Sequence, residues 1–102
     1  MLIAISNYTT SLEQVDLHRD VHIEYLNKLI STHKLLAAGR QTPPVGAVII
    51  ASNISLDEFK NILAEDPFCI EGVAEYKIFE FNPVLCDESF RRYLEAQTKH
   101  PG

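Results

Sequence analysis

Two apolar runs, Lys34-Leu35-Leu36-Ala37-Ala38-Gly39 and Ala47-Val48-Ile49-Ile50-Ala51, lie on either side of Thr42-Pro43-Pro44 in the middle of the chain. Short aliphatic runs bounded by glycine and proline are typical of buried strands. Proline cannot donate a hydrogen bond inside a sheet, so the middle segment is expected to connect two strands. The stretch therefore predicts two strands that follow each other directly along the chain.

A helix is expected on each side of this strand pair. Before it, Ser11-Leu12-Glu13-Gln14 has capping-box spacing, and apolar residues recur at helical spacing from about Asp16 to about His33. After it, Ser55-Leu56-Asp57-Glu58 repeats the capping-box spacing ahead of a shorter helix. That helix is expected to stop at Asp66-Pro67, because proline disfavours helical geometry in the residue before it.

Strands near the two ends complete the pattern, at Leu2 to Asn7 and at Val73 to Phe81. Both faces of the last strand carry bulk: Tyr76 and Ile78 share one face, and Phe79 and Phe81 share the other. A sheet with one face in water would be more polar on that side. We therefore expect the second face to be covered, most simply by a second copy of the chain.

The element order predicts an α+β domain of the ferredoxin-like kind. Strand, helix, strand, strand, helix, strand is the split βαβ pattern. Right-handed crossovers then give one antiparallel sheet with the strand order 4-1-3-2 and both helices on one face. Asp87 to Gln97 reads as an extra helix. Residues 1–83 are taken as the ferredoxin-like domain, and residues 84–102 as a C-terminal helical extension of the same domain.

Composition restricts the class of protein. The chain has 102 residues, 46% hydrophobic and 23% charged, as expected of one globular domain. Its formal net charge is -5 with acids and bases interspersed, which argues against binding to nucleic acid or to anionic membranes. No segment reads as a membrane span or a signal peptide, and Cys69 and Cys86 form no CxxC pair. A cytoplasmic location is expected.

The predicted topology brings polar residues from distant parts of the chain to one rim of the sheet. The strand and helix ends that meet there carry Ser6, Asn7, Tyr8, Arg19, His22, Arg40, Asp66 and Phe68. His22 lies on the apolar stripe of its helix, one turn before Leu26, and Asp66 is the carboxylate expected beside it. Such a pair orients one ring nitrogen and leaves the other free as a general base or acid. The alternative is a core histidine satisfied by an aspartate at a helix end.

Other residues on the rim suggest an anionic ligand and no cofactor. Arg19 and Arg40 are each suited to holding an anionic group, or to forming a surface salt bridge. No HExxH motif, Cys/His cluster or glycine-rich loop indicates a metal or a nucleotide. Ser6 is placed to join His22 and Asp66, but it lacks the context of a nucleophile elbow, so a serine hydrolase is not expected.

At these positions the chain resembles the YCII-related family. Arg19-Asp20-Val21-His22, after Ser11-Leu12-Glu13, is similar to the family segment that ends in Arg-x-x-His. Leu35-Leu36-Ala37-Ala38-Gly39 is similar to its strand ending in Ala-Gly, and Asp66-Pro67-Phe68, followed by Gly72-Val73, to its Asp-Pro-aromatic turn. The resemblance covers roughly residues 1 to 83.

The resemblance implies a dimeric α+β barrel, and it implies that His22 and Asp66 match a His–Asp pair proposed to be catalytic. Known users of this barrel include small isomerases, lyases and monooxygenases that act on cyclic compounds. Arg40 departs from the family, which often has proline after the strand-ending glycine. The segment 84–102 has no counterpart in the minimal family domain.

Two functions of different classes follow. In the first, a small lyase or isomerase uses His22 to move a proton and Asp66 to orient it, while Arg19, Arg40, Ser6 and Phe68 bind a small cyclic or anionic substrate. In the second, a non-catalytic homodimer binds a small molecule or acts as an accessory domain. A cofactor-free monooxygenase is a third possibility.

Overall fold

The computed structural model describes residues 1–98 of the chain. Its four strands, β1 (Leu2–Tyr8), β2 (Ala37–Arg40), β3 (Ala47–Ala51) and β4 (Ala74–Glu80), form one antiparallel sheet in the order β2-β3-β1-β4. The predicted order 4-1-3-2 is the same order counted from the other edge, so the ferredoxin-like prediction is confirmed.

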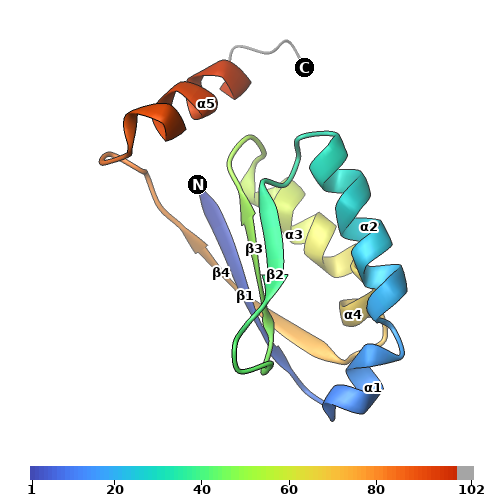
Figure 1. Ribbon diagram of the computed structural model, residues 1–102. Coiled ribbons are helices and arrows are strands. Elements are labelled where there is room, and N and C mark those ends of the chain that lie inside the picture. The colour runs from blue at the N-terminus through green and yellow to red at the C-terminus, as the bar shows by residue number, and fades with distance from the viewer. Residues whose placement is uncertain (99–102) are drawn as a thin grey trace.

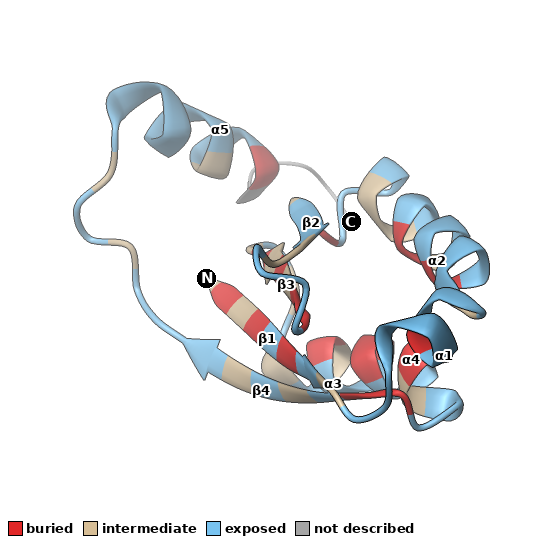
Figure 2. Cartoon of the chain, turned by 60° about the horizontal axis from the view of Figure 1, so that its bottom comes forward, coloured by how far each residue is buried: buried red, intermediate tan, exposed pale blue. Residues whose placement is uncertain are grey.

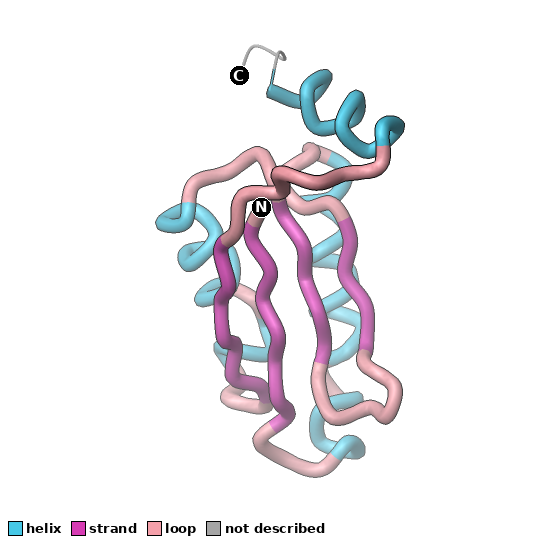
Figure 3. Tube along the Cα trace, turned by 90° about the vertical axis from the view of Figure 1, so that its left-hand side faces the viewer, coloured by secondary structure: helices cyan, strands magenta, loops and turns pink. Residues whose placement is uncertain are grey.

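The five helices are α1 (Leu12–Asp16), α2 (Arg19–Ser31), α3 (Leu56–Glu65), α4 (Pro67–Ile70) and α5 (Glu88–Thr98). The helices α2 and α3 lie on one face of the sheet, as predicted (Figure 1). Figure 3 looks onto the opposite face, where the four strands lie side by side and α5 lies past their ends. None of the helices in residues 1–98 is long and apolar enough to cross a membrane.

Serine residues begin two of the helices, at the positions that the sequence pattern indicates. The Ser11 hydroxyl accepts a hydrogen bond from the Gln14 N–H at 3.3 Å, and the Ser55 hydroxyl accepts one from the Glu58 N–H at 3.1 Å. Each bond satisfies a backbone donor that has no partner within its helix, and such a cap contributes about 1 kcal/mol.

The prediction of one helix from Asp16 to His33 is wrong at both of its ends. Asp16 is the last residue of α1, and His18, with φ -108° and ψ 4°, separates α1 from α2. At the other end α2 stops at Ser31, and His33 adopts a left-handed φ of 63°. A left-handed residue just past a helix turns the chain away from the helical path, which explains the earlier stop.

The second strand also differs from its prediction over residues 34–39. It starts at Ala37 and includes Arg40, whereas Leu35 belongs to the turn after α2, where its N–H donates to the Leu29 carbonyl at 3.2 Å. The Leu35 side chain is 2% exposed and packs in the core. An apolar residue at a helix end and one in a strand look alike in sequence, since both are buried.

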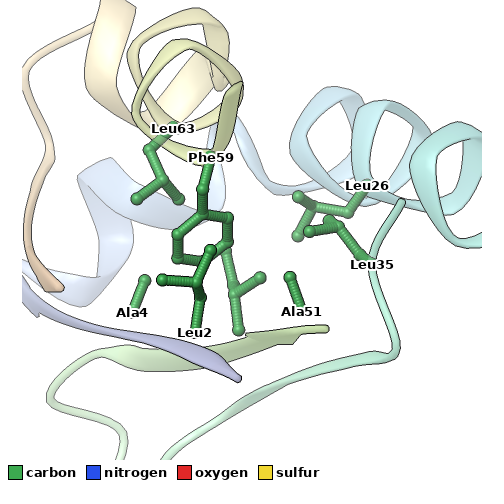
Figure 4. Packing of buried hydrophobic residues seen from close by; sticks show 8 residues of the cluster. Leu2, Ala4, Leu26, Leu35, Ala51, Phe59 and Leu63 are labelled. Atoms are coloured by element: carbon green, nitrogen blue, oxygen red, sulfur yellow. The ribbon is translucent and has the colours of Figure 1, made fainter. Parts of the chain in front are cut away.

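The main core lies between the sheet and the two long helices (Figure 4). Phe59 points from α3 onto the sheet, where Leu2, Ala4 and Ala51 lie below it. Burial alternates along β1, with Leu2 and Ala4 buried on the helix side (Figure 2). Phe59 is fully buried, and truncating such a residue to alanine typically costs about 3–5 kcal/mol.

The C-terminal helix is confirmed, at Glu88–Thr98 rather than Asp87 to Gln97. It packs near the end of the sheet where β1 begins, since the Ser52 hydroxyl donates to Gln97 Oε1 at 2.9 Å. Phe90 and Tyr93 lie beside Met1 in an apolar groove there. Residues 99–102 of the predicted extension lie outside the described residues.

Candidate active site

His22 and Asp66 touch, as the topology predicts. Nδ1 of His22, on α2, lies 2.6 Å from Oδ1 of Asp66, which stands between α3 and α4. His22 is 6% exposed and Asp66 is fully buried. A buried carboxylate is stable only when donors compensate it, so its other partners decide what the pair can do.

Asp66 begins a helix as well as ending one. The prediction that Asp66-Pro67 stops α3 is correct, but the chain continues directly into α4, which the sequence analysis did not anticipate. Asp66 Oδ1 accepts a hydrogen bond from the Phe68 N–H at 3.2 Å, and Pro67 occupies the first turn. Proline suits the first helical position because it lacks an N–H that would need a partner. The carboxylate of the candidate site is thus also a helix cap.

A third donor to Asp66 comes from the sheet. The Tyr76 hydroxyl on β4 donates to Asp66 Oδ2 at 2.5 Å. Burial, followed by the charge and hydrogen bond of Asp66, raises the pKa of Tyr76 far above its usual range. The phenol therefore stays protonated and donates. From the sequence Tyr76 is expected only on one face of its strand, so its place in the site is an addition to the predicted residues.

The second ring nitrogen of His22 is not fully buried. No hydrogen-bond partner is found for Nε2 in the described part of the chain, and no fully buried side-chain nitrogen or oxygen there lacks one. Nε2 is therefore accessible. One face of the imidazole is covered by the Phe68 ring, with centroids 3.7 Å apart and planes 3° apart. His22 and Phe68 both line a cavity of about 240 Å³.

This cavity lies between α2 and the edge of the sheet. Its polar lining consists of Tyr8, Arg19, His22, Asn27 and Arg40. Its apolar lining includes Ile23, Leu26, Ile30, Ala38, Ala47 and Phe68. Ala38 and Arg40 face the helices, because they pair with the buried Ile49 and Ala47 across the β2–β3 ladder. Small side chains at positions 38 and 47 leave the space open.

The two arginines differ in their surroundings. Arg19 is exposed at the mouth of the cavity, and no ion pair of its guanidinium is found among residues 1–98. Arg40 pairs with Asp16 at 2.5 Å, and its Nε donates to the Tyr8 hydroxyl at 3.0 Å. The hydrogen bond with Asp16 raises the pKa of Arg40. Arg40 therefore holds Tyr8 against the cavity, a contact that the sequence analysis did not foresee.

Ser6 lies outside the cavity lining. It is fully buried, and its hydroxyl accepts a hydrogen bond from the Ala47 N–H at 2.8 Å. Gly46 crosses so close to Ser6 that an added Cβ would lie 1.8 Å from the Ser6 carbonyl oxygen. In this structure the Ser6 hydroxyl joins β1 to the first residue of β3 and does not reach His22 or Asp66.

Within residues 1–98, no three His, Cys, Asp or Glu side chains gather in a way that would hold a metal ion. The chemistry available in the described site is that of an imidazole, a carboxylate, two phenols and two guanidinium groups. Such a set moves protons and binds oxygen-bearing or anionic groups.

Comparisons with known proteins agree with this fold. Residues 1–82 match the family model of the YCII-related domain. A similar solved structure is 5-chloro-2-hydroxyhydroquinone dehydrochlorinase from Burkholderia phenoliruptrix AC1100, in complex with 2,5-dihydroxybenzoquinone. The match has a TM-score of 0.66 and 21% identity, and covers 80% of this chain and 94% of that one. Likeness at this identity shows the fold alone. A search of curated proteins found no match.

Proposed function

The chain belongs to the YCII-related family, and on that premise we propose that it converts a small molecule by lyase- or isomerase-type proton transfer. His22 is the general base and acid, and Asp66 orients it. The observation that carries the proposal is the buried contact between His22 Nδ1 and Asp66 Oδ1, in a histidine that lines a cavity and whose Nε2 has no hydrogen-bond partner among residues 1–98.

The charges in the site suit a base at Nε2. When Nε2 takes a proton, the imidazole becomes positive, and the adjacent carboxylate of Asp66 stabilises that charge. In a lyase reaction the electron pair of the broken bond to hydrogen forms a double bond, and a leaving group departs with its own bonding pair. In an isomerase reaction His22 returns the proton to another atom of the substrate.

The cavity favours a cyclic, anionic substrate. Its volume of about 240 Å³ suits a single-ring compound, and aliphatic residues of α2 form one wall. Arg19, at the mouth, is placed to hold a carboxylate or phenolate. The structural neighbour is named a dehydrochlorinase and was solved with a cyclic compound, which supports this substrate class.

Turnover of a small panel tests the proposal. The panel consists of single-ring carboxylic acids and hydroxyquinones, including 2,5-dihydroxybenzoquinone, with products followed by absorbance and mass spectrometry. We expect one compound to be converted, and His22→Ala to abolish the conversion. The matched control is His33→Asn, at an exposed left-handed position outside the cavity lining; asparagine tolerates that backbone conformation. Full activity of His22→Ala would refute the role of His22.

A second candidate is a non-catalytic binding domain. It is favoured by the second task of Asp66, which also caps α4, because a residue needed for folding does not have to be catalytic. Under this reading the same panel raises the melting temperature without forming product, and His22→Ala loses stability rather than activity.

The working form is proposed to be a homodimer with the two sheets packed face to face. Support comes from the apolar side chains on the open face, where Phe79 is 52% and Phe81 44% exposed. Light scattering after gel filtration tests this, and Phe79→Glu should shift a dimer to monomer. A monomeric wild-type chain would refute the proposed homodimer.

The free thiols Cys69 and Cys86 suit a cytoplasmic location, which is part of the proposal.

A further inference from the structure

Tyr76 reaches Asp66 from the sheet, whereas His22 reaches it from α2. Tyr76 lies on β4, directly across from Ser6 in β1, and its side chain points to the helix face of the sheet. Its hydroxyl reaches Asp66 Oδ2, whereas His22 and the Phe68 N–H both reach Oδ1. The two oxygens of one carboxylate are thus held by different parts of the fold.

This division of partners restricts the rotation of the carboxylate. A carboxylate held at Oδ1 alone can turn about its bond to Cβ, since terminal torsions of aspartate are broad. A second hydrogen bond, at Oδ2, fixes the plane of the group. Because the Tyr76 hydroxyl holds Oδ2, the other carboxylate oxygen, Oδ1, stays facing Nδ1 of His22.

We propose that Tyr76 is a positioning residue of the His22–Asp66 pair, whose hydrogen bond to Asp66 Oδ2 fixes the plane of the carboxylate so that Oδ1 faces Nδ1 of His22. A carboxylate oxygen only accepts hydrogen bonds, so the His22 nitrogen that faces it must carry the proton. Neutral His22 is therefore the Nδ1–H tautomer. Its lone pair lies on Nε2, the nitrogen without a partner among residues 1–98, which is the arrangement that a general base needs.

Other charged and titratable groups surround the pair. Arg19 on α2 and Arg40 on β2 line the cavity beside His22, and Tyr8 on β1 lies there as well. Cys69 on α4 lies near Asp66 and Tyr76, and burial raises the pKa of its thiol to about 11. His18 lies one turn before His22, where its carbonyl accepts a hydrogen bond from the His22 N–H, so the signals of the two rings must be assigned separately.

Tyr76→Phe removes the single hydroxyl and keeps the ring. Without that donor, the negative charge of Asp66 is less compensated and attracts a protonated imidazole more strongly. We expect the His22 titration, followed by NMR, to move to higher pH in the variant than in wild type. We also expect long-range proton–nitrogen spectra to show the Nδ1–H tautomer in wild type, and a broader Nδ1–H signal in the variant, where the carboxylate can turn.

Tyr25→Phe is the matched control. The Tyr25 hydroxyl donates to the backbone carbonyl of Ile62 at 2.8 Å and not to Asp66. Its loss should lower the melting temperature much as Tyr76→Phe does, yet leave the titration and the Nδ1–H signal of His22 unchanged. In an Asp66→Asn background, Tyr76→Phe should no longer move the titration.

A Tyr76→Phe protein with wild-type titration and Nδ1–H signal would overturn the proposal, and so would an equal effect of Tyr25→Phe. If Tyr76→Phe does not fold, measurements on the wild-type chain test the proposal instead. Neutral His22 as the Nε2–H tautomer, or ionisation of Tyr76 near the ordinary value of about 10, would then overturn it. These measurements need no substrate, so their outcome is independent of the proposed reaction.

Discussion

The imidazole of His22 lies parallel to the ring of Phe68, with ring centroids 3.7 Å apart. Phe68 is 1% exposed, and its own backbone N–H binds Asp66. One residue therefore contacts both members of the pair, through its ring and through its backbone. The position of the imidazole depends on α4 as much as on α2.

Phe68→Leu should disturb His22 more than it disturbs the fold. Leucine keeps an apolar side chain of similar size but removes the flat surface, so we expect a loss of about 1 kcal/mol in the free energy of unfolding. The NMR signals of His22 should broaden or split. The control is Phe59→Leu, in the main core, which should cost similar stability and leave His22 unchanged. Equal His22 spectra in both variants would contradict the role of the stack.

Ala38→Leu should close the cavity. Ala38 is an exposed residue of an edge strand and faces the helices, so a larger side chain there enters the cavity without crowding the core. Unfolding free energy should change by less than about 0.5 kcal/mol. Ligand-induced stabilisation should disappear, as measured by thermal shift with the compound panel.

The matched control for Ala38→Leu is Ala37→Leu. Ala37 is the preceding residue and pairs with Ile50, so its side chain points to the opposite face of the same strand. It should bind ligands as wild type does. Loss of binding in both variants would mean that the strand, and not the cavity, is affected.

Arg40→Gln should weaken ligand binding with little change in stability. The Arg40–Asp16 ion pair is partly exposed, and such pairs contribute about 0–1 kcal/mol. The loss of its hydrogen bond should release the Tyr8 hydroxyl from its position at the cavity, which raises KM. Arg92→Gln breaks the exposed pair with Glu88 instead and should have no effect on binding. An unchanged KM in Arg40→Gln would contradict this prediction, because ligand binding would then not depend on the hydrogen bond from Arg40 to Tyr8.

The fold should lose stability in alkaline solution. Burial raises the pKa of Tyr76 above its usual range and that of Tyr25 to about 12. The folded state then holds these protons more tightly than the unfolded state, so their contribution is complete below about pH 10 and is lost as pH rises further. Cys69, with a pKa raised to about 11, adds a loss that begins at about pH 9.

Urea unfolding at about pH 8 and about pH 10.5 measures this loss, whose slope above the unfolded pKa is at most about 1.4 kcal/mol per pH unit for the buried Tyr76 and smaller for the more exposed Tyr25 and Cys69. Tyr76→Phe removes one of the groups and should make the dependence shallower. Stability that stays constant across this range would contradict the prediction.

The parts of the fold that depend on local sequence were predictable. Ser11 and Ser55 begin helices through contacts three residues away, and Ala47–Ala51 is a strand within the predicted limits. The meeting of His22 and Asp66 follows from strand order and crossover handedness alone.

Two side-chain contacts of the site, Tyr76 with Asp66 and Arg40 with Tyr8, could not be predicted from the periodicity of apolar residues. Tyr76 reaches Asp66 only because β4 pairs with β1 in the register that sets it opposite Ser6. Arg40 reaches Tyr8 because β2 extends one residue further than its apolar run. Register and strand length are decided by contacts across the sheet, so neither contact was visible in one strand taken alone.

Because Asp66 has two structural roles, few substitutions at this position should be tolerated. Its carboxylate pairs with His22 and also starts α4. Removing one partner of a buried charged pair commonly costs about 3–5 kcal/mol, a large part of the stability of a small domain. Most random substitutions at position 66 should therefore be eliminated as unfolded chains before any change in chemistry is tested. New substrate preferences should therefore arise by substitutions at Ala38 or Arg19, which line the cavity, while the requirement for folding alone is enough to conserve Asp66.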